Sequence, residues 1–288
     1  MNKLAIIALL AITTAGLLFN AQNKYDPTFS KDALMKFQKW SSTHNKVYYT
    51  PEEKLYRISV FVNTYKTVTL HNMKNETYEQ GLNEFSDMTY EEFVAKYTGD
   101  LSDEEFKALG QENLEISQAP VAGAIDWTTK GAVNPVQNQG QCGGCWAFAA
   151  TASFETAYFN KFNQLMKFSE QASIDCDRGN NGCGGGSPDT AMAYQKASGL
   201  PSLADYPYTA TTNTCKAQGK KVSMNLAFTY NFPSSMNLLT SGVNSGVTYI
   251  SVYANQNFMN YKSGIFSDPN CSTSQTNHAI AAVGYDAD

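Results

Sequence analysis

The sequence predicts an α+β protein in which helical segments precede strands along the chain. In the first half, Leu55, Ile58 and Val62 recur at intervals of three or four residues, which is the spacing of an apolar helix face. In the second half, residues 247–253 and 279–284 are mainly β-branched or small and apolar, as is typical of buried strands. We therefore expect an α+β fold in two lobes.

Local signals place the helices of the first half. Pro51 and the two acids after it fit a first helical turn, because Pro is tolerated there and acids favour the positive end of the helix dipole. An apolar stripe predicts another helix before it, and the stripe consists of Leu34, Phe37 and Trp40. Gly81 ends this helical region, and the acidic residues 103–105 predict a further helix start.

A buried helix is predicted to begin at Cys145. A glycine-rich turn, residues 140–144, comes directly before it, and no Gly or Pro occurs in the 34 residues from Cys145 onward. This stretch is also rich in Ala, which has the highest helix propensity. The cysteine is therefore expected at a helix N-terminus.

The composition indicates a globular protein with a full core. The chain has 288 residues, of which 42% are hydrophobic and 12% aromatic, which excludes general disorder. A net charge of −5 and the lack of a long basic run argue against nucleic acid as a partner. Charge falls and glycine rises near Gln118, so we expect a boundary there, between residues 22–118 and residues 119–288.

The N-terminus resembles a secretory signal peptide, residues 1–21. Lys3 precedes an apolar run and then small residues, with cleavage expected after Ala15 or Ala21. The alternative is a membrane anchor, but the apolar segment is short for a span of about 20 residues. We expect the secretory pathway, with a lysosome-like vesicle or the outside of the cell as the destination. Two glycosylation sequons, at Asn75 and Asn270, are compatible with that route.

Cys142 and Cys145 form a C-x-x-C pair that has three interpretations. A redox dithiol needs a thioredoxin-like βαβ setting, and a zinc site needs a second pair of ligands. The third interpretation is a nucleophilic thiol at Cys145, since a helix N-terminus favours thiolate over thiol. The other cysteines stand at positions 176, 183, 215 and 271.

The candidate general base is found by elimination. Of the three histidines, His44 and His71 lie in the helical first half, so His278 is the only imidazole left if that half is removed. It follows Cys145 by 133 residues and stands at the start of a predicted buried strand. A lone histidine beside an apolar run is often a core residue, but a nucleophilic cysteine elsewhere makes a Cys–His pair the better hypothesis.

The segment 139–148, Gln-Gly-Gln-Cys-Gly-Gly-Cys-Trp-Ala-Phe, resembles the nucleophile segment of papain-like cysteine proteases, closest to the cathepsin L group. The resemblance runs from about Thr28 to the last residue. The first half resembles the inhibitory propeptide of that family. The matching positions are Glu53, Arg57, Phe61 and Asn72, followed by Gly81, Asn83, Phe85 and Asp87. Thr64 and Val68 are mild departures, where the family has Asn and usually Ile.

The resemblance implies a papain-like two-lobe fold, with a helical lobe and a β-barrel-like lobe, preceded by a helical propeptide. Cys145 would attack the scissile carbonyl of a polypeptide, and His278 would hold the thiolate as an ion pair and protonate the leaving amine. Gln139 and the Cys145 N–H would stabilise the oxyanion. The chain would be an endopeptidase zymogen that acts through an acyl-enzyme.

The resemblance also implies the substrate-binding residues. Gly185 and Gly186 would pair with an extended substrate. The pocket for the residue two before the cleaved bond would be lined by Ser187, Pro188, Tyr253, Thr276 and Ala279, and Asn277 is assigned to substrate binding as well. Because Tyr253 is bulky for that position, we expect a shallow pocket that prefers branched aliphatic side chains to Phe.

By the same resemblance, Cys142 pairs with Cys183 and Cys176 pairs with Cys215. No metal or other cofactor is expected. The expected partners are polypeptide substrates and the chain's own propeptide as an intramolecular inhibitor. We expect a monomer that binds neither nucleic acid nor, after signal cleavage, a membrane.

One departure from the family pattern is large. The family orients its histidine with the Asn of an Asn-Ser-Trp motif, but this sequence ends ten residues after His278 and contains no such motif. Cys271 is also left without the partner that the family supplies. Both observations predict a chain that lacks a C-terminal segment. The alternative function is a non-catalytic papain-like binding protein or an inactive truncated product.

Overall fold

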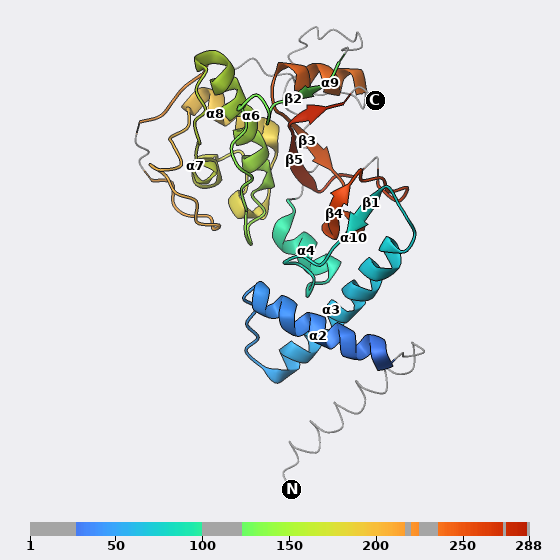
Figure 1. Cartoon of the computed structure of the whole chain (residues 1–288). Helices are drawn as coiled ribbons and strands as arrows, with labels where there is room; N and C mark the ends of the chain where they lie inside the picture. Colours follow the sequence, from blue (N-terminus) through green and yellow to red (C-terminus); the bar gives the residue numbers. More distant parts are fainter. Residues whose placement is uncertain (1–26, 100–122, 217–219, 225–235, 273–274, 287–288) are drawn as a thin grey trace. The chain divides into compact units, whose positions relative to one another are not determined.

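The computed structural model describes residues 27–99, 123–216, 220–224, 236–272 and 275–286 (Figure 1). The chain divides into two compact units, each treated separately below. The first unit contains residues 1–89 and 260–267, and the second contains residues 90–259 and 268–288. The expected signal peptide, the helix start at 103–105 and the boundary near Gln118 lie outside the described residues.

Two helices form most of the first unit. Helix α2 spans Pro27–Thr43, and α3 spans Pro51–Asn72. Two side chains cap the N-terminus of α3. The Thr50 side chain accepts from Glu53 N at 3.1 Å, and Glu53 Oε2 accepts from Tyr49 N at 2.9 Å. The predicted start at Pro51 is therefore confirmed.

Aromatic side chains form the core between α2 and α3. Phe37, Trp40 and Phe61 are buried together, and the Trp40 ring N–H donates to the Asn83 carbonyl at 2.7 Å. The predicted apolar stripes are only partly right. Leu34 and Leu55 belong to those stripes but are exposed, because the aromatic residues fill the contact between the two helices.

The first half also contains a strand that the helical interpretation missed. Strand β1, Tyr78–Gln80, pairs antiparallel with β4, Tyr261–Gly264. The Asn72 side chain holds β1 to the end of α3, because it donates to the Gln80 carbonyl and accepts from the Gln80 N–H, both at 2.9 Å. A three-residue strand whose partner lies some 180 residues later has no local periodicity, so the sequence pattern does not indicate it.

Asp87 contacts both the α2–α3 connection and helix α3. Its carboxylate accepts from Lys46 Nζ at 3.0 Å and from the Tyr48 hydroxyl at 2.9 Å. Arg57 donates to the Asp87 carbonyl at 3.0 Å. Two of the motif positions that resemble the propeptide, Arg57 and Asp87, are thus in direct contact.

Helix α6, Cys145–Phe162, runs through the second unit, and its start at Cys145 confirms the prediction. It packs against α7, Glu170–Cys176, and α8, Pro188–Ser198, on one side and against strands on the other (Figure 1). One core cluster centres on Trp146, and a second on Phe154. The single-turn helix η1 spans Gly182–Gly184.

The strands of the second unit form two small antiparallel sheets. Strand β3, Thr248–Val252, pairs with β5, His278–Ala282, and β2, Ile125–Asp126, pairs with β6, Gly284–Tyr285. These confirm the strands predicted near 247–253 and 279–284. The remaining helices are α4, Tyr90–Tyr97, α9, Met236–Ser245, and α10, Gln256–Met259.

The second unit thus combines a helical part and a strand-containing part around α6, which agrees with the predicted α+β two-lobe fold. Among the helices within the described ranges, none is both long and apolar enough to cross a membrane.

Candidate active site

Cys145 is the first residue of α6, and only 1% of its surface is exposed. Its N-cap is Gly144, which makes no side-chain cap, so the positive end of the helix faces the thiol. Backbone groups of Gly99, Trp146 and Ala279, together with that of Cys145 itself, act on the sulfur to lower the pKa of the thiol. The predicted nucleophile therefore lies where amide groups would stabilise a thiolate.

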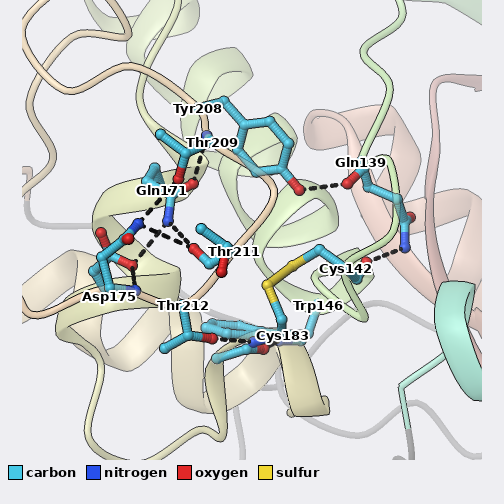
Figure 2. The surroundings of a disulfide bond; sticks show 12 residues. Gln139, Cys142, Trp146, Gln171, Asp175, Cys183, Tyr208, Thr209, Thr211 and Thr212 are labelled. Atoms are coloured by element: carbon cyan, nitrogen blue, oxygen red, sulfur yellow. Dashed lines mark hydrogen bonds between the residues drawn. A yellow bond between two sulfur atoms is a disulfide. The ribbon is translucent and has the colours of Figure 1, made fainter.

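A disulfide between Cys142 and Cys183 holds the turn before α6 (Figure 2). Gly143 N–H donates to the Cys183 carbonyl at 2.9 Å, and a Cβ on Gly143 would lie 2.7 Å from that oxygen. Glycine is required there because the obstructing atom belongs to the backbone. The second disulfide joins Cys176 and Cys215. These are the two pairs that the resemblance implied.

Gln139, the predicted oxyanion donor, is held from both ends. Its Nε2 donates to the Cys142 carbonyl at 2.8 Å and to the Tyr97 carbonyl at 2.9 Å. Its own carbonyl accepts from the Tyr208 hydroxyl at 2.6 Å (Figure 2). The Gln139 side-chain amide that would donate to an oxyanion therefore donates instead to the carbonyl of Tyr97, at the end of α4.

His278 is the first residue of β5 and pairs with Val252 of β3. Its ring Nδ1 is buried and has no hydrogen-bond partner among the described residues. Ala279, the next residue, packs against Cys145. The strand that carries the histidine therefore lies against the helix that carries the cysteine.

Gln139 and His278 line the same cavity, which has a volume of about 310 Å³. Its walls come from residues 132–139, from α6 and from β5. The fold thus brings the predicted oxyanion donor and the predicted acid–base residue to one cavity next to the nucleophile helix.

Residues 97–99, which we call the strap, cover the thiol. A Cβ added to Gly99 would lie 3.1 Å from Gly185 Cα, 3.3 Å from the Gly143 carbonyl oxygen and 3.5 Å from Cys145 Sγ. Any side chain at this position would therefore crowd the backbone of the two glycines. The sequence analysis did not single out Gly99, because nothing local indicates which chain segment passes over the cysteine.

The covered site holds its two reactive groups in their neutral forms. Burial raises the pKa of the Cys145 thiol above its usual value, although the surrounding backbone groups oppose this shift. Burial also lowers the pKa of His278 to about 4. Both shifts favour a thiol and a neutral imidazole at neutral pH over the ion pair that the resemblance implies.

The predicted pairing site for substrate lies at the start of α8. Gly185 has φ 114°, which favours glycine, and a Cβ on Gly186 would lie 2.3 Å from Asn180 Oδ1. Ser187 caps α8 by accepting from the Asp189 N–H at 3.3 Å. Pro188, the first residue of α8, is buried beside it. Gly185 and Cys145 both lie against Gly99, so the structure brings this segment to the thiol.

Tyr249 of β3, which was not predicted from the sequence, packs against the cluster that contains Cys145. It contacts the cluster of Cys145, Ala149 and Ala279, and its hydroxyl donates to Asp189 Oδ1. Burial raises the pKa of Asp189 to about 6, and the bond from Tyr249 opposes that rise. The predicted Tyr253 lies one residue beyond the end of β3, and no local pattern distinguishes Tyr249 from the other residues of the strand.

The other predicted pocket residues lie near Asn277. The Tyr253 side chain hydrogen-bonds the hydroxyl of Tyr90, the first residue of α4. Asn277 also bonds this hydroxyl, through Nδ2 at 3.4 Å. Thr276 precedes Asn277 and is partly exposed.

A buried thiol beside a histidine-bearing strand in a two-lobed α+β unit defines the class of thiol-dependent hydrolases. Comparison with known proteins identifies the family. Residues 121–288 match the papain family cysteine protease model, and residues 37–93 match the cathepsin propeptide inhibitor domain. The chain belongs to the papain family of cysteine proteases, and it is the zymogen form with an inhibitory propeptide.

Individual relatives agree with this assignment. Procathepsin L of Mus musculus is 36% identical over 99% of this chain and 85% of the relative. Caricain of Carica papaya is 36% identical over 90% of this chain and 75% of the relative. A solved structure of digestive procathepsin L 3 from the Tenebrio molitor larval midgut superposes with a TM-score of 0.78 and 32% identity, covering 89% of this chain and 85% of that one. These relatives support polypeptide substrates, inhibition by the chain's own propeptide and a route through the secretory pathway.

Proposed function

We propose that Cys145 and His278 are the catalytic pair of this peptidase and that Gln139 is a donor to the oxyanion. The observation that carries the proposal is the position of Cys145 at an uncapped helix start, with Ala279, the residue after His278, packed against it. In the reaction, the thiolate attacks the scissile carbonyl, and the imidazolium protonates the leaving amine. Water then hydrolyses the acyl-enzyme.

Removal of the strap activates this pair. Burial favours the neutral thiol and the neutral imidazole. When residues 97–99 leave, water returns, the pKa of the thiol falls and the pKa of the imidazole rises, so the proton moves from sulfur to nitrogen. The Gln139 Nε2 is released from the Tyr97 carbonyl at the same time and becomes available to the oxyanion.

We propose a hydrophobic preference two residues before the cleaved bond, with branched aliphatic side chains ahead of Phe. Tyr249 supports this preference, because its ring packs against Cys145 and Ala279 and its hydroxyl is tied to Asp189. Because its bond to Asp189 holds the Tyr249 ring in place, the pocket for the residue two before the cleaved bond is shallower and fits a large substrate side chain less well. Peptide libraries in which Phe is the preferred residue would contradict this preference.

The chain organisation is proposed as a signal peptide at 1–21, an inhibitory propeptide at 22–118 and a peptidase domain at 119–288. The final location is proposed as a lysosome-like vesicle or the outside of the cell, and the active form as a monomer. N-terminal sequencing of the secreted and activated forms checks both cleavage boundaries.

The catalytic assignment is tested by protein hydrolysis after activation. Cys145→Ala abolishes hydrolysis of denatured casein, and His278→Ala lowers it by about 10²- to 10⁴-fold. Cys271→Ser is the matched control, because Cys271 is the other free cysteine among the described residues and is exposed. Equal activity of Cys145→Ala and Cys271→Ser would refute the assignment and favour a non-catalytic binding protein.

A further inference from the structure

A group of polar atoms lies next to the proposed catalytic histidine in the sequence and contacts the hydroxyl of a tyrosine of the chain itself. The Tyr90 hydroxyl donates to the Ala254 carbonyl at 3.1 Å and accepts from Asn277 Nδ2 at 3.4 Å. The side chain of Tyr253 hydrogen-bonds the same hydroxyl. We call Tyr253, Ala254 and Asn277 the hydroxyl pocket.

The hydroxyl pocket is held in shape without Tyr90. Asn277 Oδ1 accepts from the Ala254 N–H at 2.8 Å, and the Asn277 N–H donates to the Val252 carbonyl at 3.1 Å. These bonds fix the Asn277 amide, whose Nδ2 lies 3.4 Å from both the Tyr90 hydroxyl and the Ala254 carbonyl. One donor and one acceptor are thus presented together, and a phenol hydroxyl, which both donates and accepts, matches them.

The hydroxyl pocket lies next to the reacting groups. Asn277 and His278 are consecutive residues, so their Cα atoms are about 3.8 Å apart. Tyr90 begins α4 and Tyr97 ends it, a rise of about 10 Å along the helix. The Tyr97 carbonyl occupies Gln139 Nε2, the proposed oxyanion donor. The rise of about 10 Å from Tyr90 to Tyr97 equals the length of about three extended residues.

The order of contacts along the propeptide assigns the hydroxyl pocket to one side of the cleaved bond. From Tyr90 to Gly99, the chain touches first the pocket, then Gln139, and finally Cys145 and Gly185. Gly185 belongs to the segment proposed to bind the acyl half of the substrate. The pocket, at the other end of this path, therefore faces the leaving half. This placement moves Tyr253 from the pocket two residues before the cleaved bond, where the resemblance put it, to the leaving side.

We propose that, once the propeptide has left, the hydroxyl pocket binds a tyrosine side chain within the first three residues after the cleaved bond. The pocket then makes the enzyme selective for peptides with a phenolic hydroxyl in the leaving half, and the propeptide's Tyr90 occupies it as a built-in competitor. This inference rests on the proposed function, because it assumes that Cys145 and His278 cleave peptides.

The test compares quenched fluorescent peptides that differ only in having Tyr or Phe at each of the first three positions after the cleaved bond. The activated enzyme is expected to cleave the Tyr peptide with about three- to tenfold higher kcat/KM at one of these positions, the effect of one neutral hydrogen bond. The variants Tyr253→Phe and Asn277→Ala bring this Tyr-to-Phe ratio toward one. Tyr261→Phe is the control, because its exposed hydroxyl donates to the Gly264 carbonyl and its loss leaves the ratio unchanged.

The ratio is internal to each variant, so a general loss of rate does not affect it. Hydrolysis that iodoacetamide abolishes but that shows no preference for Tyr at any of the three positions would overturn the hydroxyl pocket and leave the proposed function intact. Absence of thiol-dependent hydrolysis of every peptide would overturn the proposed function and this inference with it.

A second readout needs no catalysis. In the full precursor with Cys145→Ala, the further change Tyr90→Phe is expected to raise amide hydrogen exchange in α4 by about three- to tenfold, because the helix loses its hydroxyl anchor. Tyr49→Phe is the control, since Tyr49 is 88% exposed. Unchanged exchange in the Tyr90 variant would show that the pocket does not recognise a hydroxyl group.

Discussion

The passage of the strap over the thiol can be tested by adding one methyl group, Gly99→Ala. The new Cβ would lie 3.1 Å from Gly185 Cα and 3.3 Å from the Gly143 carbonyl oxygen. Both atoms belong to the backbone and cannot rotate away, so the strap must move outward by a few tenths of an ångström. That shift weakens the action of the Gly99 backbone on the sulfur and the bond from Gln139 to the Tyr97 carbonyl.

Overpacking of this kind costs about 1–3 kcal/mol, which corresponds to an opening equilibrium about five- to 150-fold more favourable. The assay is alkylation of Cys145 in the uncleaved precursor by iodoacetamide, followed by mass spectrometry of the labelled peptide. Because only the open form reacts, the labelling rate is expected to rise by the same factor.

The matched control for this experiment is Gly246→Ala. A Cβ on Gly246 meets nothing closer than 3.5 Å, an ordinary contact, so this variant leaves the labelling rate unchanged. If Gly99→Ala is labelled at the wild-type rate, the strap does not cover the thiol as described, and the explanation of latency is wrong.

Three further predictions concern stability, each measured by urea unfolding in a Cys145→Ala background that prevents processing. Because the pKa of Asp189 is raised to about 6, its protonation stabilises the fold at low pH, and this contribution is lost as pH rises from about 4 through 6. Asp189→Asn should therefore be near neutral at pH 4 and stabilising by roughly 2–3 kcal/mol at pH 7, whereas an equal effect at both pH values would contradict the burial argument. Replacing Cys142 and Cys183 together by Ser opens a loop with a sequence separation of 41 and should lower the free energy of unfolding by about 4 kcal/mol. A decrease below about 1 kcal/mol would be inconsistent with this loop-closure model. Asn72→Ala removes two bonds to the Gln80 backbone and should destabilise the first unit by about 1–2 kcal/mol, and Asn72→Asp, which keeps only the acceptor, should fall between Asn72→Ala and wild type.

Local signals predicted those elements whose cause is local. The helix at Pro51 follows from its capping residues, and the helix at Cys145 follows from a glycine-rich turn before a long stretch without Gly or Pro. Strand β1 escaped prediction because its partner β4 lies far along the chain. Its hydrogen bonds are a property of tertiary structure rather than of residues 78–80.

The sequence predicted Cys145 and His278 as site residues, but it did not predict the protonation states of their side chains. The positions of Cys145 and His278 followed from a helix-start argument and from elimination, whereas the disulfide pairs needed the family resemblance. The pKa shifts that favour the neutral forms of both groups come from burial in the folded chain, which no sequence pattern reports. The hydroxyl of Tyr249 in β3 donates to Asp189 in α8. The register of β3 against β5, which places Tyr249 opposite Ala281, is not visible in the sequence.

The central claim is that propeptide removal converts a neutral thiol and imidazole into a reactive ion pair. The most direct measurement is the pH dependence of Cys145 alkylation before and after activation, with Cys271 as the internal reference thiol. In the precursor, labelling of Cys145 at pH 5 is expected to be slow and to rise with pH, because burial raises the pKa of the thiol and lowers that of His278 to about 4. After activation, Cys145 should react rapidly already at pH 5 while Cys271 stays slow. If activated Cys145 is as slow as Cys271 at pH 5, no ion pair forms and the catalytic assignment is contradicted.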